Sequence, residues 1–233
     1  MSDMPIDEIT DQVKSALYDK SCVCPLCNSN FTAKAVKVGK NQVTSLDDDL
    51  YPHYSLVNPI LYDVIVCPEC GYSTISKNTK NLLSQQKKWL NEIFFKGNTN
   101  KPTYGEYTTT EEAIHKHKMA LLACITRKGK LNEQAYIALH IAWLLRDLGK
   151  EKESKSFLSR AYDAYREAFS KESFPMVGTD EQTLMYTLAA IAYELEKYSE
   201  SKQYLSMVIT RPEISARLKD RAFTLKEKLA EVL

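Results

Sequence analysis

Apolar and polar positions follow two different patterns along this chain. Before about residue 76, apolar residues largely alternate over short runs such as 31–38 and 62–66, which predicts short β-strands. Beyond residue 110, apolar residues recur every three or four positions, which places them on one face of a helix. The change of period predicts a mainly α protein with a small β module at its N-terminal end.

The helical part contains turn and capping residues that divide it into six expected helices. Thr108 and Thr109, each three residues before a glutamate (Glu111 and Glu112), offer a capping box for the first of them. Gly129 and Gly149 are expected to end the first and second helices, because glycine readily adopts the left-handed conformation found there.

Two stretches of the helical part share a frame of small and apolar residues that recurs after 47 positions. The earlier frame comprises Ala138, Ile141, Ala142, Leu145, Ser154 and Leu158, and the later one Met185, Leu188, Ala189, Ala192, Ser201, Leu205 and Pro212. This order of residues resembles the tetratricopeptide pattern, whose usual period is 34 residues. We therefore expect a TPR-like antiparallel array with one overlong helix. A generic antiparallel helical bundle remains the alternative.

A basic segment connects the two parts. Residues 77–101 contain six lysines and a single acid, together with Trp89, Phe94 and Phe95. Their apolar positions predict a helix over about 79–95, and the turn residues after it predict a loop over 97–107. The expected domains are thus an N-terminal segment and ribbon at 1–76, a basic connecting helix and loop at 77–107, and the helical domain at 108–233.

Two CPxC motifs carry the most specific chemical signal. Cys24 and Cys27 form one pair and Cys67 and Cys70 the other, with 39 residues between the pairs. Each motif presents two thiolates from one tight turn, and two such knuckles complete a tetrahedral zinc shell. Gly71, and less readily Asn28, tolerates the positive φ needed after the second cysteine of each knuckle. We expect one zinc ion per chain on these four cysteines.

A closed shell of four thiolates predicts a structural rather than a catalytic ion, because catalytic zinc keeps an open coordination position. A thioredoxin-like redox pair is the alternative, but that motif has one CxxC beside a βαβ pattern, which is absent here. Cys22 stands two residues before Cys24 and could replace it. The two-residue spacing to Cys27 favours Cys24. Cys124 lies on an apolar helical stripe and is interpreted as a core residue.

Overall charge and motif content narrow the functional classes. The net charge of +1 lacks the basic excess typical of nucleic-acid-binding proteins. The start of the chain has neither a basic nor an apolar signal region, and no apolar run could span a bilayer, so we expect a cytoplasmic protein without membrane segments. Walker, dinucleotide-binding, GxSxG and HExxH motifs are absent, and no enzymatic activity is expected.

The remaining histidines and acids are weaker candidates. His53 lies near Asp47, Asp48 and Asp49, which allows a second metal or anion site, although an acidic turn with a packed or solvated histidine is the favoured interpretation. His115 and His117 are expected on different faces of one helix, and His140 in the core.

The motif order around the cysteines resembles a bacterial family known as domain of unknown function 2225. The matching positions are Cys24, Cys27, Phe31, Asp47 to Asp49, His53, Tyr54, Asn58, Pro59, Tyr62, Cys67, Cys70, Gly71 and Tyr72. The resemblance covers nearly the whole chain. It implies a prokaryotic cytoplasmic protein with a ribbon followed by a helical-repeat region, and it implies no activity.

Three functions are compatible with these features. The first is a protein-interaction or scaffold module that holds a protein or peptide partner in the helical-repeat groove. The second is nucleic-acid or transcription-linked binding through the ribbon and the Lys-rich helix. Acidic residues outnumber basic ones between residues 22 and 76, which opposes nucleic-acid binding by the ribbon. Four thiolates on one divalent ion add a further charge of about −2 there. The third is an unrecognised metal-dependent enzyme using the acidic loop and His53.

Overall fold

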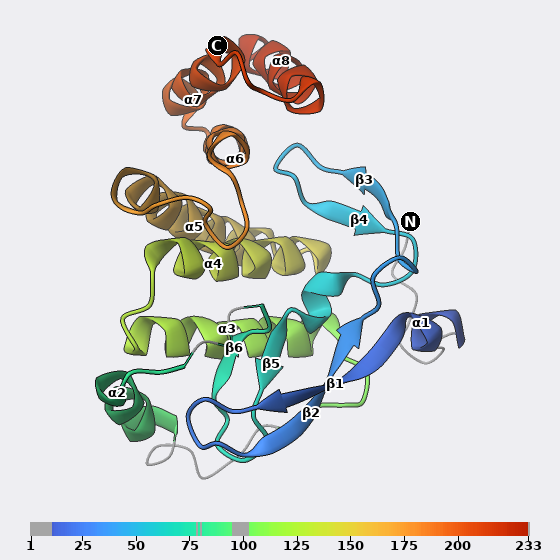
Figure 1. Cartoon of the computed structure of the whole chain (residues 1–233). Helices are drawn as coiled ribbons and strands as arrows, with labels where there is room; N and C mark the ends of the chain where they lie inside the picture. The colour runs from blue at the N-terminus through green and yellow to red at the C-terminus, as the bar shows by residue number, and fades with distance from the viewer. Residues whose placement is uncertain (1–10, 78, 80, 95–102, 233) are drawn as a thin grey trace. The chain divides into compact units, whose positions relative to one another are not determined.

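The computed structural model describes residues 11–77, 79, 81–94 and 103–232 (Figure 1). The chain forms two compact units. The first comprises Met1–Ser45 and Pro52–Gly129, and the second comprises Leu46–Tyr51 and Lys130–Leu233. A six-residue segment from the N-terminal half of the sequence therefore belongs to the helical unit.

Among its described residues, the first unit contains short antiparallel β-hairpins, three α-helices and a 3-10 helix. Its elements are α1 (Asp11–Ala16), β1 (Leu17–Val23), β2 (Asn30–Val36), most of β3 (Val43–Leu46), β4 (Pro52–Tyr54), the 3-10 helix η2 (Pro59–Tyr62), β5 (Val64–Val66), β6 (Ser73–Ile75), α2 (Ser84–Phe94) and α3 (Thr110–Thr126). The strands form three two-stranded sheets, β1–β2, β3–β4 and β5–β6. In the first sheet Leu17 pairs with Val36 and Val23 with Asn30, and in the third Val64 pairs with Ile75.

Helix α3 supplies the apolar face on which the β5–β6 hairpin packs. The predicted capping box starts it, because Thr109 Oγ1 accepts a hydrogen bond from the Glu112 amide at 3.1 Å and Glu112 Oε2 accepts one from the Thr109 amide at 3.1 Å. At its C-terminal end the left-handed residue is Lys128, with φ 52°, and not Gly129 as expected. Gly129 is needed for space, because a Cβ there would lie 2.5 Å from Cys124 Sγ.

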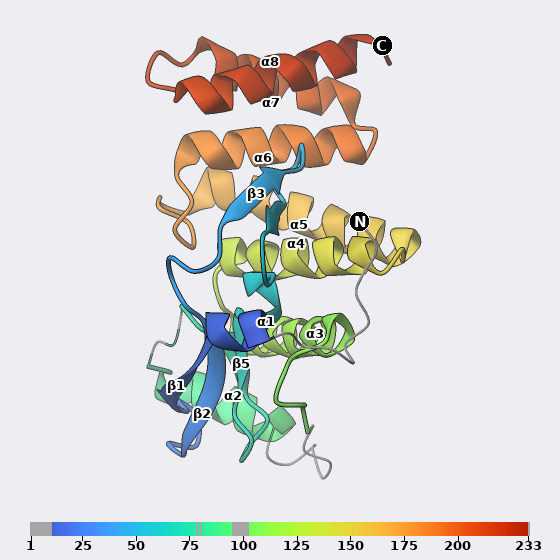
Figure 2. The ribbon, with the colours of Figure 1, turned by 90° about the vertical axis from the view of Figure 1, so that its right-hand side faces the viewer.

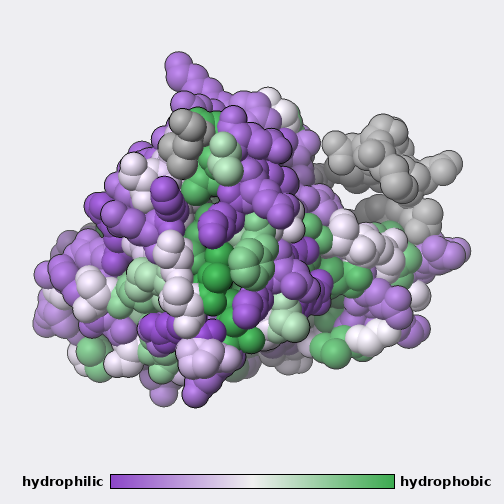
Figure 3. Space-filling view, turned by 90° about the horizontal axis from the view of Figure 1, so that it is seen from above, coloured by the Kyte–Doolittle hydropathy of each residue, from purple (hydrophilic) through white to green (hydrophobic). Residues whose placement is uncertain are grey.

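The second unit consists of antiparallel helices that pack side by side (Figure 2). They are α4 (Leu131–Asp147), α5 (Glu151–Lys171), α6 (Glu181–Glu194), α7 (Tyr198–Thr210) and α8 (Ala216–Ala230). Buried residues of α6, α7 and α8 form one core cluster, with Leu50 packed against it from outside the helices. Apolar side chains also reach the surface at the end of this unit, where Met207 and Phe223 are about two-fifths exposed, and Figure 3 views this end.

The helix pairs α4–α5 and α6–α7 repeat the same turn after 47 residues. Gly149 and Glu196 have φ values of 67° and 60° at equivalent positions. The next residues, Lys150 and Lys197, share φ −86° and ψ 59°. Ser154 Oγ donates to the carbonyl of Ala142, and Ser201 Oγ to that of Ala189, both at 2.8 Å. The two hairpins are therefore a structural repeat, and the 21 residues of α5 provide the expected overlong helix.

Several predicted boundaries differ from the observed elements. The expected helix over 79–95 is observed as α2 from Ser84 to Phe94, whereas residues 95–102 of the predicted loop lie outside the described residues. The compact units also group the chain differently from the division at 76 and 107, since α3 belongs to the first unit. Within the described part of the chain, no helix combines the length and apolar character required to cross a membrane.

Candidate functional site

The two CPxC motifs of the first unit meet at one point. Cys24 Sγ lies 3.6 Å from Cys70 Sγ, and Cys27 Sγ lies 3.6 Å from Cys67 Sγ. All four sulfur atoms lie within 4.8 Å of one another. Zinc–sulfur bonds of ~2.3 Å at the tetrahedral angle would separate the sulfur atoms by ~3.8 Å. The cluster is therefore compatible with one metal ion.

The two knuckles have the same backbone geometry. In the first, the Asn28 amide donates to the Cys24 carbonyl and the Cys24 amide to the Ser29 carbonyl, both at 2.9 Å. In the second, the Gly71 amide donates to the Cys67 carbonyl at 2.8 Å and the Cys67 amide to the Tyr72 carbonyl at 2.9 Å.

The two residues after the knuckles have the conformation that the sequence predicts. Asn28 has φ 63° and Gly71 has φ 74°. Glycine adopts this left-handed conformation without steric cost, and asparagine is among the other residues that visit it. The conformation turns the chain back so that both thiols of each knuckle face the same point.

Hydrogen bonds between the thiols show how the cluster shares its protons. The hydrogen bond shared by Cys24 and Cys70 lowers the pKa of Cys24 to about 5 and raises the pKa of Cys70. Burial raises the pKa of Cys67, although Ser29 Oγ, 3.2 Å away, opposes this shift. A divalent cation at the centre would stabilise all four sulfurs as thiolates, because metal ligation deprotonates cysteine.

Apolar residues surround the cysteines and tie them to the helices of the first unit. Leu26, Tyr72, Leu90, Phe94 and Ala123 form one core cluster with Cys24, Cys67 and Cys70. The ring centroids of Tyr72 and Phe94 are 6.1 Å apart at a near-perpendicular angle. The buried side of α2 thus packs over the knuckles. The metal cluster and the adjoining helix α2 share one core.

The structure distinguishes between Cys22 and Cys24. Cys22 lies on β1 opposite Phe31, with its Sγ 3.6 Å from the Lys20 carbonyl oxygen, and it is not part of the cluster. Cys124 is buried in α3, as expected for a core residue.

The acidic residues Asp47, Asp48 and Asp49 lie in the second unit and are bound by cations from its helices. Arg146 of α4 contacts Asp47 at 3.1 Å and Asp49 at 3.0 Å, and Lys228 of α8 contacts Asp48 at 2.5 Å. Sequence reasoning did not find these partners, because they lie about 100 to 180 positions away and no local pattern marks them. Among the described residues, no metal-ligand group combines His53 with these acids.

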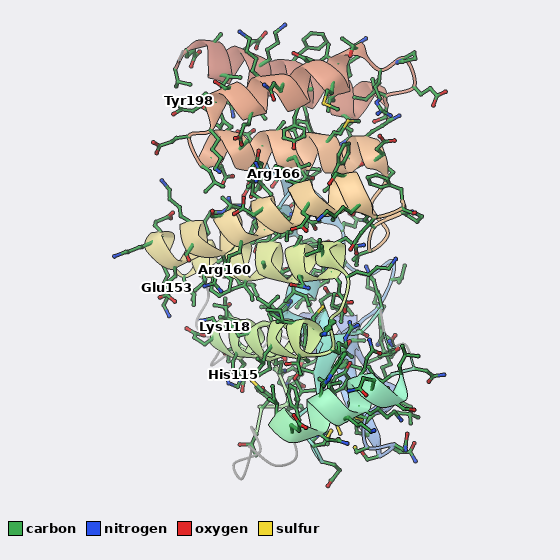
Figure 4. The ribbon with its side chains drawn as sticks, turned by 90° about the vertical axis from the view of Figure 1, so that its left-hand side faces the viewer. His115, Lys118, Glu153, Arg160, Arg166 and Tyr198 are labelled. Carbon is green, nitrogen blue, oxygen red and sulfur yellow. The ribbon has the colours of Figure 1, made fainter. Side chains whose placement is uncertain are left out.

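The other histidines occupy the positions expected of them. His117 is buried, with its Nδ1 2.7 Å from the Ala113 carbonyl oxygen, whereas His115 is exposed on the surface of α3 (Figure 4) and lies 2.9 Å from the Tyr104 hydroxyl. The two side chains therefore point in different directions. In the second unit, His140 is buried and stacks on Trp143, with ring centroids 5.3 Å apart.

The Lys-rich segment is only partly described. Lys87 and Lys88 lie on α2, whereas Lys80, Lys96 and Lys101 lie outside the described residues. Two apolar residues of this helix, Leu90 and Phe94, are buried against the cysteine cluster. These two residues therefore dock the helix onto the cysteine cluster.

Comparison with known families gives a match over almost the whole chain. A family model described as "Uncharacterized protein conserved in bacteria (DUF2225)" matches residues 17–229. No curated protein and no solved structure matches the chain.

Proposed function

The chain belongs to the bacterial family of uncharacterised proteins DUF2225, and we propose that it is a non-enzymatic protein-interaction or scaffold module in the cytoplasm. In this proposal the helical-repeat domain binds a protein or peptide partner. The observation that carries this proposal is the repeated hairpin of the second unit. Helix pairs that recur with the same turn and the same serine-to-carbonyl bond build extended surfaces suited to binding peptides or helices.

The cysteine cluster is given a structural role in this proposal. The residues that would hold one zinc ion are Cys24, Cys27, Cys67 and Cys70. Four sulfur ligands fill a tetrahedral shell and leave no position for a substrate or an activated water molecule. The ion would fix the knuckles and the hydrophobic contacts of Tyr72 and Phe94 around them.

Affinity purification of the tagged full-length chain from its native cytoplasm tests this function. The captured molecules are identified with and without nuclease treatment, and the Lys87→Glu/Lys88→Glu variant is processed in parallel. We expect protein partners that remain bound after nuclease treatment and that also bind the variant. These partners should form a complex of fixed stoichiometry when the purified components are mixed.

A different result would favour the alternative function. Loss of all captured molecules on nuclease treatment and in the charge-reversal variant would contradict the scaffold function. It would favour nucleic-acid binding through the Lys-rich helix, where phosphate contacts supply most of the affinity.

A further inference from the structure

The segment Leu46–Tyr51, here named the acidic segment, lies within the second unit although it belongs to the N-terminal half of the sequence. It forms a tight turn in which the Leu50 amide donates to the Asp47 carbonyl at 3.1 Å and the Asp47 amide donates to the Tyr51 carbonyl at 2.9 Å. The turn is the tip of the β3–β4 hairpin and lies beside α6 in two perpendicular views (Figures 1 and 2).

Helix α4 holds the buried end of the acidic segment. Asp49 is 0 % exposed, and its Oδ2 accepts hydrogen bonds from Trp143 Nε1 at 2.5 Å and Arg146 Nη1 at 3.0 Å. Tyr51 stacks on Trp143 with ring centroids 5.1 Å apart, and its hydroxyl donates to the Asp147 carboxylate. One carboxylate and one aromatic ring are therefore bound together by a single helix face.

Helix α8 binds the other end, partly through the peptide backbone. Arg221 Nη1 donates to the Asp47 carbonyl at 3.0 Å and Arg221 Nη2 to the Leu46 carbonyl at 3.4 Å. Lys228 pairs with the Asp48 carboxylate at 2.5 Å. The Arg221 contacts to backbone carbonyls would bind any peptide in this conformation, whatever its side chains. The Lys228 ammonium group favours an acidic side chain at the position of Asp48.

The surface between these helices also has an apolar part and room beyond the acidic segment. Leu50 packs against the core cluster of α6, α7 and α8. A cavity of about 380 Å³ adjoins Asp48 and is lined by Tyr186 of α6 and by Arg217 and Arg221 of α8. Four basic side chains, a Trp face and an apolar contact thus surround the acidic segment and its cavity; the basic residues are Arg146, Arg217, Arg221 and Lys228. These are the features by which helical grooves bind acidic peptides.

We propose that the face formed by α4, α6 and α8 is a binding site for acidic peptide segments, and that Leu46–Tyr51 occupies it in cis. The proposal rests on the proposed function and specifies its partner. The partner presents three consecutive carboxylates, with an aromatic residue two positions after the last, as Asp47 to Asp49 and Tyr51 do.

Covalent attachment makes the acidic segment a strong competitor. A segment tethered within one chain acts at an effective concentration of roughly millimolar. A partner segment of similar affinity must exceed this concentration before it replaces the acidic segment. A partner that also binds the chain at a second site can replace it at a lower concentration. The unmodified chain should consequently bind a free acidic peptide weakly, and a chain whose acidic segment is weakened should bind it more tightly.

The probe that tests the site is a fluorescent peptide of residues 44–53, and its binding is measured by anisotropy. We compare the full-length chain with its Asp47→Asn/Asp48→Asn variant, because these side chains are 38 % and 42 % exposed and leave the buried Asp49 unchanged. We expect the variant to bind the probe at least tenfold more tightly than the unmodified chain. The same peptide with three Asn in place of Asp should not bind either protein.

Lys228→Gln in the variant background provides the matched control on the helical side, because this side chain is 43 % exposed and its loss removes one cation without opening the core. It should weaken probe binding several-fold while the helical circular dichroism stays unchanged. A folded Asp47→Asn/Asp48→Asn variant that binds the acidic and Asn peptides alike up to about 1 mM would overturn the proposal. If that variant still captured a protein partner after nuclease treatment, the proposed scaffold function would remain supported, and only this peptide site would be excluded.

Discussion

At the scale of single residues, the equivalent positions Asn28 and Gly71 control the geometry of the cysteine cluster. Both have positive φ, and both place the amide that closes a knuckle on its first cysteine. A side chain with a Cβ costs about 1–2 kcal/mol in this conformation, with asparagine among the exceptions.

Substitutions at these two positions should change the stability of the first unit by different amounts. Gly71→Ala should lower the free energy of unfolding of the metal-loaded first unit by about 1–2 kcal/mol, and Asn28→Gly should be neutral or slightly stabilising. Chemical denaturation followed by release of the metal to a chromogenic chelator measures both. Equal effects of the two substitutions would contradict the conformational explanation.

Glu194 gives the second unit a pH dependence. Burial and the neighbouring Asp49 raise its pKa to about 7, although Arg146 opposes the shift. The folded unit therefore keeps a proton that the unfolded chain has lost between the ordinary carboxyl pKa of 4.5 and about 7. Stability falls across this interval as pH rises, by at most about 1.4 kcal/mol per pH unit.

The measurement is the melting temperature of the full-length chain from pH 4.5 to 8, compared with Glu194→Gln. The unmodified chain should lose helical stability through this interval and then level off above pH 7. The variant carries no titrating group at this position, and its curve should be flatter. Parallel curves for the two proteins would exclude Glu194 as the cause.

At the scale of elements, the repeated turn places a glycine in one copy and a glutamate in the other. Gly149 and Glu196 are both left-handed, yet only glycine is free of steric cost there. The ion pair of Glu196 with Lys155 is 3.8 Å long and solvent-exposed, so its loss should matter little.

Glu196→Gly should accordingly stabilise the second unit by about 1 kcal/mol, and Gly149→Ala should destabilise it by a similar amount. Urea denaturation followed by circular dichroism at 222 nm measures both changes. Glu196→Ala serves as the control that removes the ion pair and keeps the strained conformation. A stabilisation by Glu196→Ala equal to that by Glu196→Gly would show that charge, and not φ, is responsible.

The same elements show how far sequence reasoning reaches. The knuckles, the capping box at Thr109 and the 47-residue frame depend on neighbouring residues, and each was predicted from local patterns. Strand β1 was missed because Asp19, Lys20 and Ser21 interrupt its apolar alternation. The site of the acidic segment was missed because its partners Arg221 and Lys228 are distant in sequence, and only the folded chain brings them together.

At the scale of the whole molecule, the cysteine cluster forms part of a core of the first unit, and the second unit has its own helical core. Removal of a ligand should therefore affect the two units unequally. Small β modules bury too little surface to fold without such a cluster.

Cys67→Ser should release the metal and unfold the knuckles while most of the helical circular dichroism signal remains. Cys22→Ser, on the same unit but outside the cluster, should keep one metal ion per chain. Elemental analysis of both purified variants, with spectra recorded before and after dialysis against a chelator, measures the difference. A full metal complement in Cys67→Ser would show that the ligand set is different.

The origin of the acidic segment also sets an order of events during synthesis. Asp48 leaves the ribosome long before its partner Lys228 has been translated. At about 5–20 residues per second, the interval lasts roughly 10 to 40 s. Asp47 and Asp49 can meet Arg146 about midway through this interval, whereas Asp48 lacks its basic partner until the end of it. The helical unit can close around its acidic segment only when α8 has emerged, so the emergence of this helix sets the time of this step of folding.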